Sequence, residues 1–393
     1  MANELAFVLI NPHTIAKSRT GGVIGRFMSR TGLDLVGARM FAPSPMLAGE
    51  YAAVVGNDKN LEPEMRGLLA DYVLKNYSPD HKTGQVRRVM MILLEGENAL
   101  QKVKDTAGSV ITGTGETIRD TFGDYVVDDN KQVKYFEPAV LIGSGVDDTA
   151  ATLKLWSRHS SSDGGLLTKA IDASDSNPQW QQTLVLIKPD NFLFPNARPG
   201  NIIDMLSRSG LKIIAAKVHR MSVVQAEEFY RPVRSILREK MRIRVGEKTI
   251  KLLEQEFNIE IPPNIRNMIE ENIAPLVGDE QFNQIIKFMT GCYPPKCSPD
   301  EKAEGGRSKC LALVYAGLDA VDKIRGLLGP TDPSKAQPGS VRRELGQDIM
   351  VNAAHASDSV ENARREIAIV KIDEDLTAPL IKKYYGNNGR GGT

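Results

Sequence analysis

The stretch T-L-V-L-I-K-P-D-N-F-L-F-P-N-A-R-P-G-N-I-I-D-M-L-S-R-S-G-L-K-I, from Thr183 to Ile213, decides the fold. It begins with a short apolar run, turns at a proline, and continues past a glycine into an apolar pattern of helical period. The residues S-R-S-G-L then lead into a second apolar run. This order predicts a strand, an amphipathic helix and a second strand.

The same order of elements occurs near the N-terminus. Leu5 to Leu35 reads L-A-F-V-L-I-N-P-H-T-I-A-K-S-R-T-G-G-V-I-G-R-F-M-S-R-T-G-L-D-L. Later segments also recur in matching order: E-G-E-N-A-L (Glu95–Leu100) with A-G-L-D-A-V (Ala316–Val321), and T-I-R (Thr117–Arg119) with S-V-R (Ser340–Arg342). The sequence therefore predicts one duplicated unit that fills most of the chain.

The join between the two copies is rich in Ser, Asp and Gly, a composition that cannot bury a core. We predict a first domain over 1–156, a linker over 157–179 and a second domain over 180–375, with insertions near 234–280 and 292–309. In the second copy we expect strands at Thr183–Lys188, Leu211–His219, Cys310–Tyr315 and Glu366–Lys371, and helices at Gly200–Arg208, Ala316–Leu328 and Ser359–Arg365. The predicted fold class is α+β: two ferredoxin-like (βαββαβ) domains in tandem, each an antiparallel sheet with helices on one face.

Composition and charge limit the class of protein. The chain has 393 residues, is 41% hydrophobic and 25% charged, and carries a formal net charge of +1, which is typical of a globular protein without a bias toward polyanions. No apolar run reaches the ~18–20 residues that span a membrane. The N-terminus M-A-N-E-L-A-F-V lacks the regions of a secretory signal. These features predict a cytoplasmic protein with no membrane contact.

The cysteines are few and lie close together. A zinc site needs about four Cys or His ligands, often in close pairs, whereas Cys292, Cys297 and Cys310 have no histidine near them in the sequence. Few cysteines also suit a reducing compartment. We therefore predict free thiols, with Cys310 opening a buried strand, and no metal-ligating side chains.

The stretch N-A-A-H-A-S-D-S-V-E-N-A-R-R-E-I, from Asn352 to Ile367, holds the candidate nucleophile. Alanines flank His355 and leave its ring accessible. Asp358 and Glu361 resemble the capped start of a helix, whose free N–H groups favour an anion such as phosphate. Glu366 is a candidate to accept a hydrogen bond from one ring nitrogen, so that the other nitrogen attacks. An isolated histidine is usually structural, and it is this setting that favours chemistry.

Cations and a hydroxyl lie upstream of His355, next to turns. They are Lys188 at the end of a strand, Arg325 and Thr331 around a helix end and turn, and Arg342 in P-G-S-V-R. Phosphoryl transfer depends mainly on positioning and charge neutralisation, so a polyphosphate needs several such groups. Each group alone is unspecific, and the set together indicates a phosphate site.

Several segments of the second copy resemble the nucleoside diphosphate kinase family. They are V-L-I-K-P-D, E-E-F-Y, I-R-G-L-L-G-P-T-D-P-S-K-A-Q-P-G-S-V-R, and the stretch around His355. The resemblance extends from Gln182 to Asp373, and more faintly from Glu4 to Trp156. The chain thus resembles a tandem two-copy form of the family with a degenerate N-terminal copy.

The resemblance implies a nucleoside diphosphate kinase. The γ-phosphate of a nucleoside triphosphate such as ATP would pass to His355 and then to a nucleoside diphosphate, in ping-pong order, with Mg²⁺ bridging the phosphates. It implies catalytic roles for His355, Lys188, Glu366, Tyr230 and Ser357, and substrate binding by Lys188, Arg325, Thr331, Arg342, Asn352 and Phe282. Alignment leaves the base-stacking ring at Gln281 or Phe282. The family's assembly into oligomers implies self-association through the kinase-like domains.

The first copy departs from this pattern. Asn11 stands where the lysine belongs and Leu141 where the histidine belongs, although Arg119 remains. The second copy also departs, because Ala356 replaces the usual glycine of the signature. One rival hypothesis is a non-catalytic nucleotide-binding scaffold. Another is a nucleic-acid-binding protein built on the basic run Arg234–Arg244, which the neutral overall charge disfavours.

Overall fold

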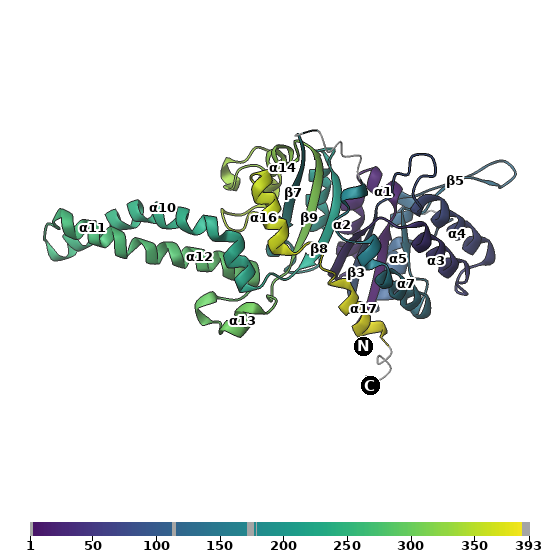
Figure 1. The fold of residues 1–393 in the computed structure, drawn as a ribbon, viewed down its shortest axis with the longest axis horizontal. Coiled ribbons are helices and arrows are strands. Elements are labelled where there is room, and N and C mark those ends of the chain that lie inside the picture. The colour runs from purple at the N-terminus through teal and green to yellow at the C-terminus, as the bar shows by residue number, and fades with distance from the viewer. Residues whose placement is uncertain (1–2, 112–114, 171–176, 178, 387–393) are drawn as a thin grey trace. The chain divides into compact units, whose positions relative to one another are not determined.

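The computed structural model describes residues 3–111, 115–170, 177 and 179–386. The chain divides into two compact units, one made of Met1–Val218 with Leu311–Thr393, and the other of His219–Cys310. The first unit contains the two four-stranded sheets, and the second is mainly helical (Figure 1).

The first copy forms a sheet of strand order β2-β3-β1-β6, in which the paired strands run antiparallel. Its strands are β1 (Asn3–Ile10), β2 (Asp34–Phe41), β3 (Val89–Glu97) and β6 (Val140–Ile142), with a separate hairpin of β4 (Asp124–Val127) and β5 (Val133–Glu137). Its helices are α1 (Pro12–Ala16), α2 (Thr20–Thr31), α3 (Pro45–Gly56), α4 (Pro63–Tyr77), α5 (Ala99–Ala107), α6 (Ile118–Phe122), α7 (Val146–Arg158) and α8 (Ser160–Asp163).

The second copy forms a sheet of order β10-β7-β9-β8, which is the same arrangement when strands are counted within each copy. Its strands are β7 (Trp180–Ile187), β8 (Lys212–His219), β9 (Cys310–Leu318) and β10 (Ala354–Ala356). Its helices outside the second unit are α9 (Arg198–Ser207), α14 (Ala320–Leu328), α15 (Val341–Leu345), α16 (Val360–Val370) and α17 (Thr377–Tyr385). Two sheets of one topology confirm the predicted ferredoxin-like tandem.

Helices cover both faces of the first sheet, so the expectation of helices on one face is wrong. Residues Leu5 to Ile10 of β1 are all at most 1% exposed. Leu5, Phe7 and Leu9 share a core cluster with side chains of α3, α4 and α7, whereas α2 and α5 pack together elsewhere on the copy. A strand that is buried on both faces is a continuous apolar run without apolar/polar alternation. Its sequence therefore does not show on which faces of the sheet the helices pack.

The predicted strand at Glu366–Lys371 is wrong, because these residues up to Val370 belong to α16. Ala363, Glu366, Ile369 and Val370 are its buried residues, at the three- and four-residue spacing of a helix face. The fourth strand is instead β10, which carries His355. The end of α16, I-A-I-V, is a continuous apolar run of four residues, and such a short run can belong to a buried strand or to a helix.

The backbone of the two copies repeats in unusual detail. Positive φ angles, which side chains other than glycine rarely adopt, recur at matching positions. The pairs are Gly32 and Gly210 (64° and 70°), Gly96 and Gly317 (156° and 152°), Asn98 and Asp319 (53° each), Gly108 and Gly329 (81° each), and Ala139 and Ala353 (58° and 68°). Shared special conformations of this kind support the duplication read from the sequence.

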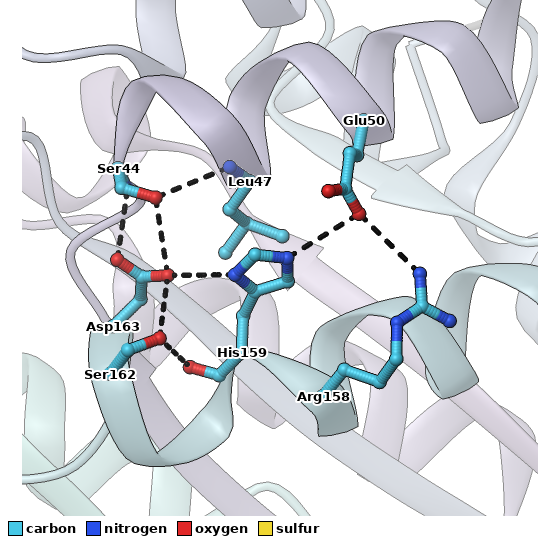
Figure 2. Close-up of polar contacts among 7 residues, drawn as sticks. All are labelled: Ser44, Leu47, Glu50, Arg158, His159, Ser162 and Asp163. Carbon is cyan, nitrogen blue, oxygen red and sulfur yellow. Dashed lines mark hydrogen bonds and ion pairs between the residues drawn. The ribbon is translucent and has the colours of Figure 1, made fainter.

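The start of the predicted linker is folded onto the first copy. Figure 2 shows the imidazole of His159 between two carboxylates, with Nδ1 3.2 Å from Asp163 and Nε2 3.4 Å from Glu50. Asp163 also accepts a hydrogen bond of 3.1 Å from the backbone N–H of Ser44, the N-cap of α3. The polar residues of this segment therefore hold it against the first copy. Residues 171–176 and 178 of the linker lie outside the described residues, and the domain boundaries stay a prediction.

The second unit is built around a helical hairpin. Its helices are α10 (Val223–Phe257), α11 (Pro263–Asn272), α12 (Ala274–Thr290) and α13 (Pro299–Ala303), and α10 lies alongside α12 (Figure 1). Arg234 and Arg238, from the basic run, both make paired hydrogen bonds to Asp279 on α12. Their charge is therefore used within the hairpin. No helix among the described residues is long and apolar enough to cross a membrane, and the three cysteines are free thiols.

Equivalent helices of the two copies, α2 and α9, pack against each other inside the first unit. Glycines allow the close approach: a Cβ added to Gly200 would lie 2.3 Å from the carbonyl oxygen of Gly21 and 2.4 Å from the backbone nitrogen of Gly25. Because those neighbours are backbone atoms, they cannot move aside as a side chain would.

We expect Gly200→Ala to lower the free energy of unfolding by about 1–3 kcal/mol, the usual range for overpacking. The measurement is chemical denaturation followed by circular dichroism. Gly67→Ala is the matched control, because Gly67 is an exposed glycine of α4 whose added Cβ would meet nothing within 4 Å, and alanine there should stabilise the helix slightly. Equal stabilities of the two variants would contradict the role of this contact.

Candidate active site

The end of β7 and the whole of β10 bring the candidate residues together. In the antiparallel register, His355 pairs with Leu186 and Ala354 with Ile187. Lys188 therefore follows directly after β7, the strand with which β10 pairs. Asn352 precedes β10, Arg342 lies on α15 and Glu366 on α16. Residues far apart in the sequence thus converge because one short strand pairs with another.

The imidazole of His355 is oriented by a carboxylate. Its Nε2 lies 2.9 Å from Oε2 of Glu366, and the hydroxyl of Ser357 donates to the same oxygen at 2.7 Å. A carboxylate only accepts hydrogen bonds, so Nε2 carries the proton and the lone pair resides on Nδ1. The Glu366 side chain is 6% exposed and that of His355 21%. The carboxylate is therefore buried behind a partly accessible ring.

Lys188 forms the second part of the site. Its ammonium group donates to Oδ1 of Asn352 at 2.7 Å and to the carbonyl of Met350 at 3.1 Å. Burial, together with the charge of Arg342, lowers the pKa of Lys188 to about 8, although Asp190 and Asp348 oppose the shift. A buried ammonium beside the Arg342 guanidinium is well suited to an anionic ligand, because a phosphate would add negative charge next to both cations.

Arg342 is fixed by backbone carbonyls on both sides. Its Nη1 donates to Gly329 at 2.9 Å and its Nη2 to Ala354 at 3.0 Å, the residue next to His355. Arg325 donates to the carbonyl of Asp358 at 3.1 Å, on the other side of the histidine. Two guanidinium groups therefore flank the strand that carries His355.

Asn352 links the loop of Thr331 to this network. Its Nδ2 donates to the carbonyl of Thr331 at 3.1 Å and to that of Ile349 at 2.8 Å. Thr331 is itself exposed. The structure therefore brings together Lys188, Arg325, Thr331, Arg342, Asn352, His355, Ser357 and Glu366, all within the first unit.

Tyr230 and Phe282 belong to the second unit. Tyr230 lies on α10, 8% exposed, with its ring 5.0 Å from that of Phe229. Phe282 lies on α12, 3% exposed, with the guanidinium of Arg234 5.4 Å from the centre of its ring. The roles of these two residues at the site stay predictions.

Two residues that sequence reasoning missed shape the site. Asp348 accepts hydrogen bonds of 2.7 Å from the N–H groups of Met350 and Val351, and this turn presents the Met350 carbonyl to Lys188. Asn191 is fully buried and donates to the carbonyls of Lys188 and Ala353. Asp and Asn after a strand or in a loop are known turn formers, which was the available signal.

The first copy has replaced these groups. Leu141 pairs with Leu9 in the register that His355 shares with Leu186, so an apolar side chain stands at the nucleophile's position. Asn11 accepts a hydrogen bond of 2.7 Å from the hydroxyl of Tyr77 and donates to Glu137 at 3.2 Å. All of these groups are buried. A buried hydrogen-bond network of Asn11, Tyr77 and Glu137 therefore occupies the position that Lys188 and its partners occupy in the second copy.

Arg119 shows what the first copy has kept. It donates to the carbonyls of Gly108 and Val140 at 2.8 and 3.2 Å, which are the counterparts of the carbonyls bound by Arg342. Burial lowers the pKa of Arg119 to about 10. Its survival is explained by these structural contacts.

Comparisons with known proteins identify the family of this chain. The sequence profile of the nucleoside diphosphate kinase family matches residues 181–237 and 267–375. A nucleoside diphosphate kinase of Helicobacter pylori strain Shi470 is 32% identical over 196 residues, covering 50% of this chain and 98% of that protein. One from Campylobacter hominis is 30% identical over 188 residues, covering 48% of this chain and 93% of that protein.

Solved structures include an NDP kinase from Pyrobaculum aerophilum, 28% identical, with a TM-score of 0.33, covering 48% of this chain and 94% of that one. The chain belongs to the nucleoside diphosphate kinase family. The profile leaves residues 238–266 unmatched, and these residues fall in the helical hairpin.

The lowered pKa of Lys188 is open to direct measurement. We expect one lysine Cε signal in a ¹³C NMR titration to move with a midpoint near pH 8, because burial disfavours the ammonium form. Lys188→Met should remove that signal and no other. If the signal that this variant removes titrated near pH 10, the effect of burial on the pKa of Lys188 would be disproved.

Proposed function

We propose that this chain transfers the γ-phosphate of a nucleoside triphosphate to a nucleoside diphosphate through a phosphohistidine at His355. One observation carries the proposal: Glu366 holds Nε2 of His355 at 2.9 Å, while Lys188 and Arg342 converge on the same strand end. This arrangement supplies a nucleophile whose reactive nitrogen is fixed and a cationic place for the phosphate.

The first half-reaction follows from this geometry. The Nδ1 lone pair attacks the γ-phosphorus, a P–N bond forms, and the bond to the β,γ-bridging oxygen breaks. The electron pair stays on that oxygen, and the nucleoside diphosphate leaves. The ring then carries positive charge, which the Glu366 carboxylate stabilises while Ser357 fixes its position. A second nucleoside diphosphate reverses these steps, which gives ping-pong order.

The remaining residues bind the nucleotide in this proposal. Lys188, Arg325, Arg342 and the hydroxyl of Thr331 neutralise and orient the phosphates. Asn352 contacts the ribose as well as holding Lys188. The catalytic role of Tyr230 and the base-stacking role of Phe282 rest on the family resemblance alone.

The family is generally dependent on Mg²⁺, and the residues present fit a metal carried by the substrate. Among the described residues, no three His, Cys, Asp or Glu side chains are grouped to hold a metal ion. Mg²⁺ is often held chiefly by phosphate oxygens and water. When bound with the nucleotide, it would neutralise phosphate charge beside Lys188 and Arg342.

The scaffold hypothesis has less support. A chain freed from catalysis need not keep the Lys188–Asn352 and His355–Glu366 contacts, and the first copy lacks both. We propose that the protein acts in nucleotide metabolism in the cytoplasm and self-associates through its kinase-like domains.

Nucleic acid is disfavoured as a partner because the guanidinium groups of Arg234 and Arg238 both form ion pairs with Asp279.

We expect labelled ATP with Mg²⁺ to place acid-labile, base-stable phosphate on the wild-type protein, and GDP to remove it as GTP. His355→Ala should abolish labelling, because the only proposed acceptor is lost. His81→Ala is the control, since His81 is exposed on the first copy and should label fully. A folded wild type that binds nucleotide without labelling would favour the scaffold hypothesis.

The number of nucleotide sites tests the proposed division of labour between the copies. We expect isothermal titration with ADP and Mg²⁺ to give one site per chain, because Asn11 and Leu141 stand in the first copy where Lys188 and His355 stand in the second. A double variant, Lys188→Met with Arg342→Met, should bind at none. Two sites in the wild type, one of them surviving in that variant, would show that the first copy also binds.

A further inference from the structure

The turn after β7 carries a buried amide that the proposed chemistry does not use. Asn191 is 0% exposed and ends the 3-10 turn of Pro189–Asn191. Its Nδ2 donates to the carbonyl of Lys188 at 3.1 Å and to the carbonyl of Ala353 at 2.8 Å. One side chain therefore ties the end of β7 to the residue just before β10.

Ala353 is the strained residue of this junction. Its φ of 68° lies in the left-handed region, which is unfavourable for a residue with a Cβ and persists only where the surroundings impose it. Ala353 stands between Asn352, which holds the Lys188 ammonium, and Ala354, whose carbonyl holds Arg342. Its conformation therefore sets the direction of the chain on both sides of the site.

The first copy repeats the strained turn with another donor. Ala139 has a φ of 58°, and its carbonyl accepts 3.1 Å from the N–H of Asn11 and 2.9 Å from the hydroxyl of Thr14. Thr14 follows Asn11 by three residues, as Asn191 follows Lys188, and is also 0% exposed. A buried donor to the left-handed alanine is thus present even where lysine and histidine are gone.

Thr14 and Asn191 differ in how many carbonyls they hold. In the first copy a hydroxyl with one hydrogen supports the turn alone. In the second copy an amide with two hydrogens supports the turn and also holds the carbonyl of Lys188. Both copies need the left-handed turn for their fold. The exact position of the turn matters only in the second copy, where the proposed nucleophile and the cation lie on either side of it.

We infer that Asn191 is a positioning residue that fixes His355 and Lys188 relative to each other by holding the left-handed turn at Ala353. Asn191 does not touch substrate and acts through these two groups. The inference rests on the proposed phosphoryl transfer for its kinetic consequence. Small misplacements of reacting groups can cost about a hundredfold in rate, which sets the size of the expected effect.

The test uses a matched pair at position 191 in the full-length protein. Asn191→Thr keeps a hydroxyl donor like that of Thr14, whereas Asn191→Val has nearly the same shape without a donor. We expect Asn191→Val to slow single-turnover phosphorylation of His355 by about 10- to 100-fold, with a smaller change in KM. Asn191→Thr should recover most of that rate.

The first copy supplies the control. Thr14→Val removes the equivalent donor from the equivalent turn, and it should lower the melting temperature about as much as Asn191→Val while leaving the rate unchanged. A normal rate in Asn191→Val would overturn the inference and leave Asn191 with a structural task only. Equal rates in the Thr and Val variants would overturn it as well. Asn191→Ala repeats the comparison if valine prevents folding.

A readout without activity separates this inference from the proposed function. The ¹³C titration of Lys188 should shift its midpoint in Asn191→Val and not in Thr14→Val, because only the former loosens the carbonyl and turn beside Lys188. If the wild type formed no phosphohistidine, the proposed function would fail, and this titration would still decide whether Asn191 positions Lys188. An unchanged midpoint would overturn the inference.

Discussion

The pairing of β10 with the end of β7 is the constraint on which the rest of the site depends. Only the pairs Ala354–Ile187, His355–Leu186 and Ala356–Val185 form it, so the ladder alone is too short to fix a strand. Its ends are held by other groups: Asn191 and the Lys188 N–H before it, and the hydrogen bonds between Ser357 and Leu184 after it. Lys188 and Ser357, for which roles in phosphoryl transfer are proposed, are therefore also among the groups that keep this strand in register.

The duplication shows which part of this arrangement belongs to the fold. Both copies keep the sheet order, the left-handed alanine and the arginine that binds two backbone carbonyls. Among the described residues, only the second copy carries a buried ammonium held by an asparagine, and a histidine held by a buried glutamate, around that frame. The frame is thus stable without the chemistry, which agrees with the rule that function resides in a site placed on a fold.

Sequence reasoning reached the fold and most of the site for different reasons. Glycine, proline and apolar periods identified the repeated strand–helix–strand unit, and the resemblance of the segments around Lys188, Arg342 and His355 to one family indicated which residues would meet. Sequence reasoning missed β10 because its three residues, A-H-A, are too few to show the apolar/polar alternation of a strand. It mistook the end of α16 for a strand because Glu366 faces inward, and polar inward residues break an apolar pattern. Asn191 was missed because its partners are backbone carbonyls, and no sequence pattern records a carbonyl's direction.

The buried ammonium explains why the first copy has changed as it has. A pKa of about 8 in place of 10.5 means that keeping Lys188 charged at neutral pH opposes folding by about 3 kcal/mol. Asn11 has no such cost, since its amide is paired with Tyr77 and Glu137. The first copy therefore lacks a destabilising charge that the second copy carries. A buried charge kept at a stability cost, beside a histidine oriented by a carboxylate, is better explained by selection for phosphate binding than by selection for stability.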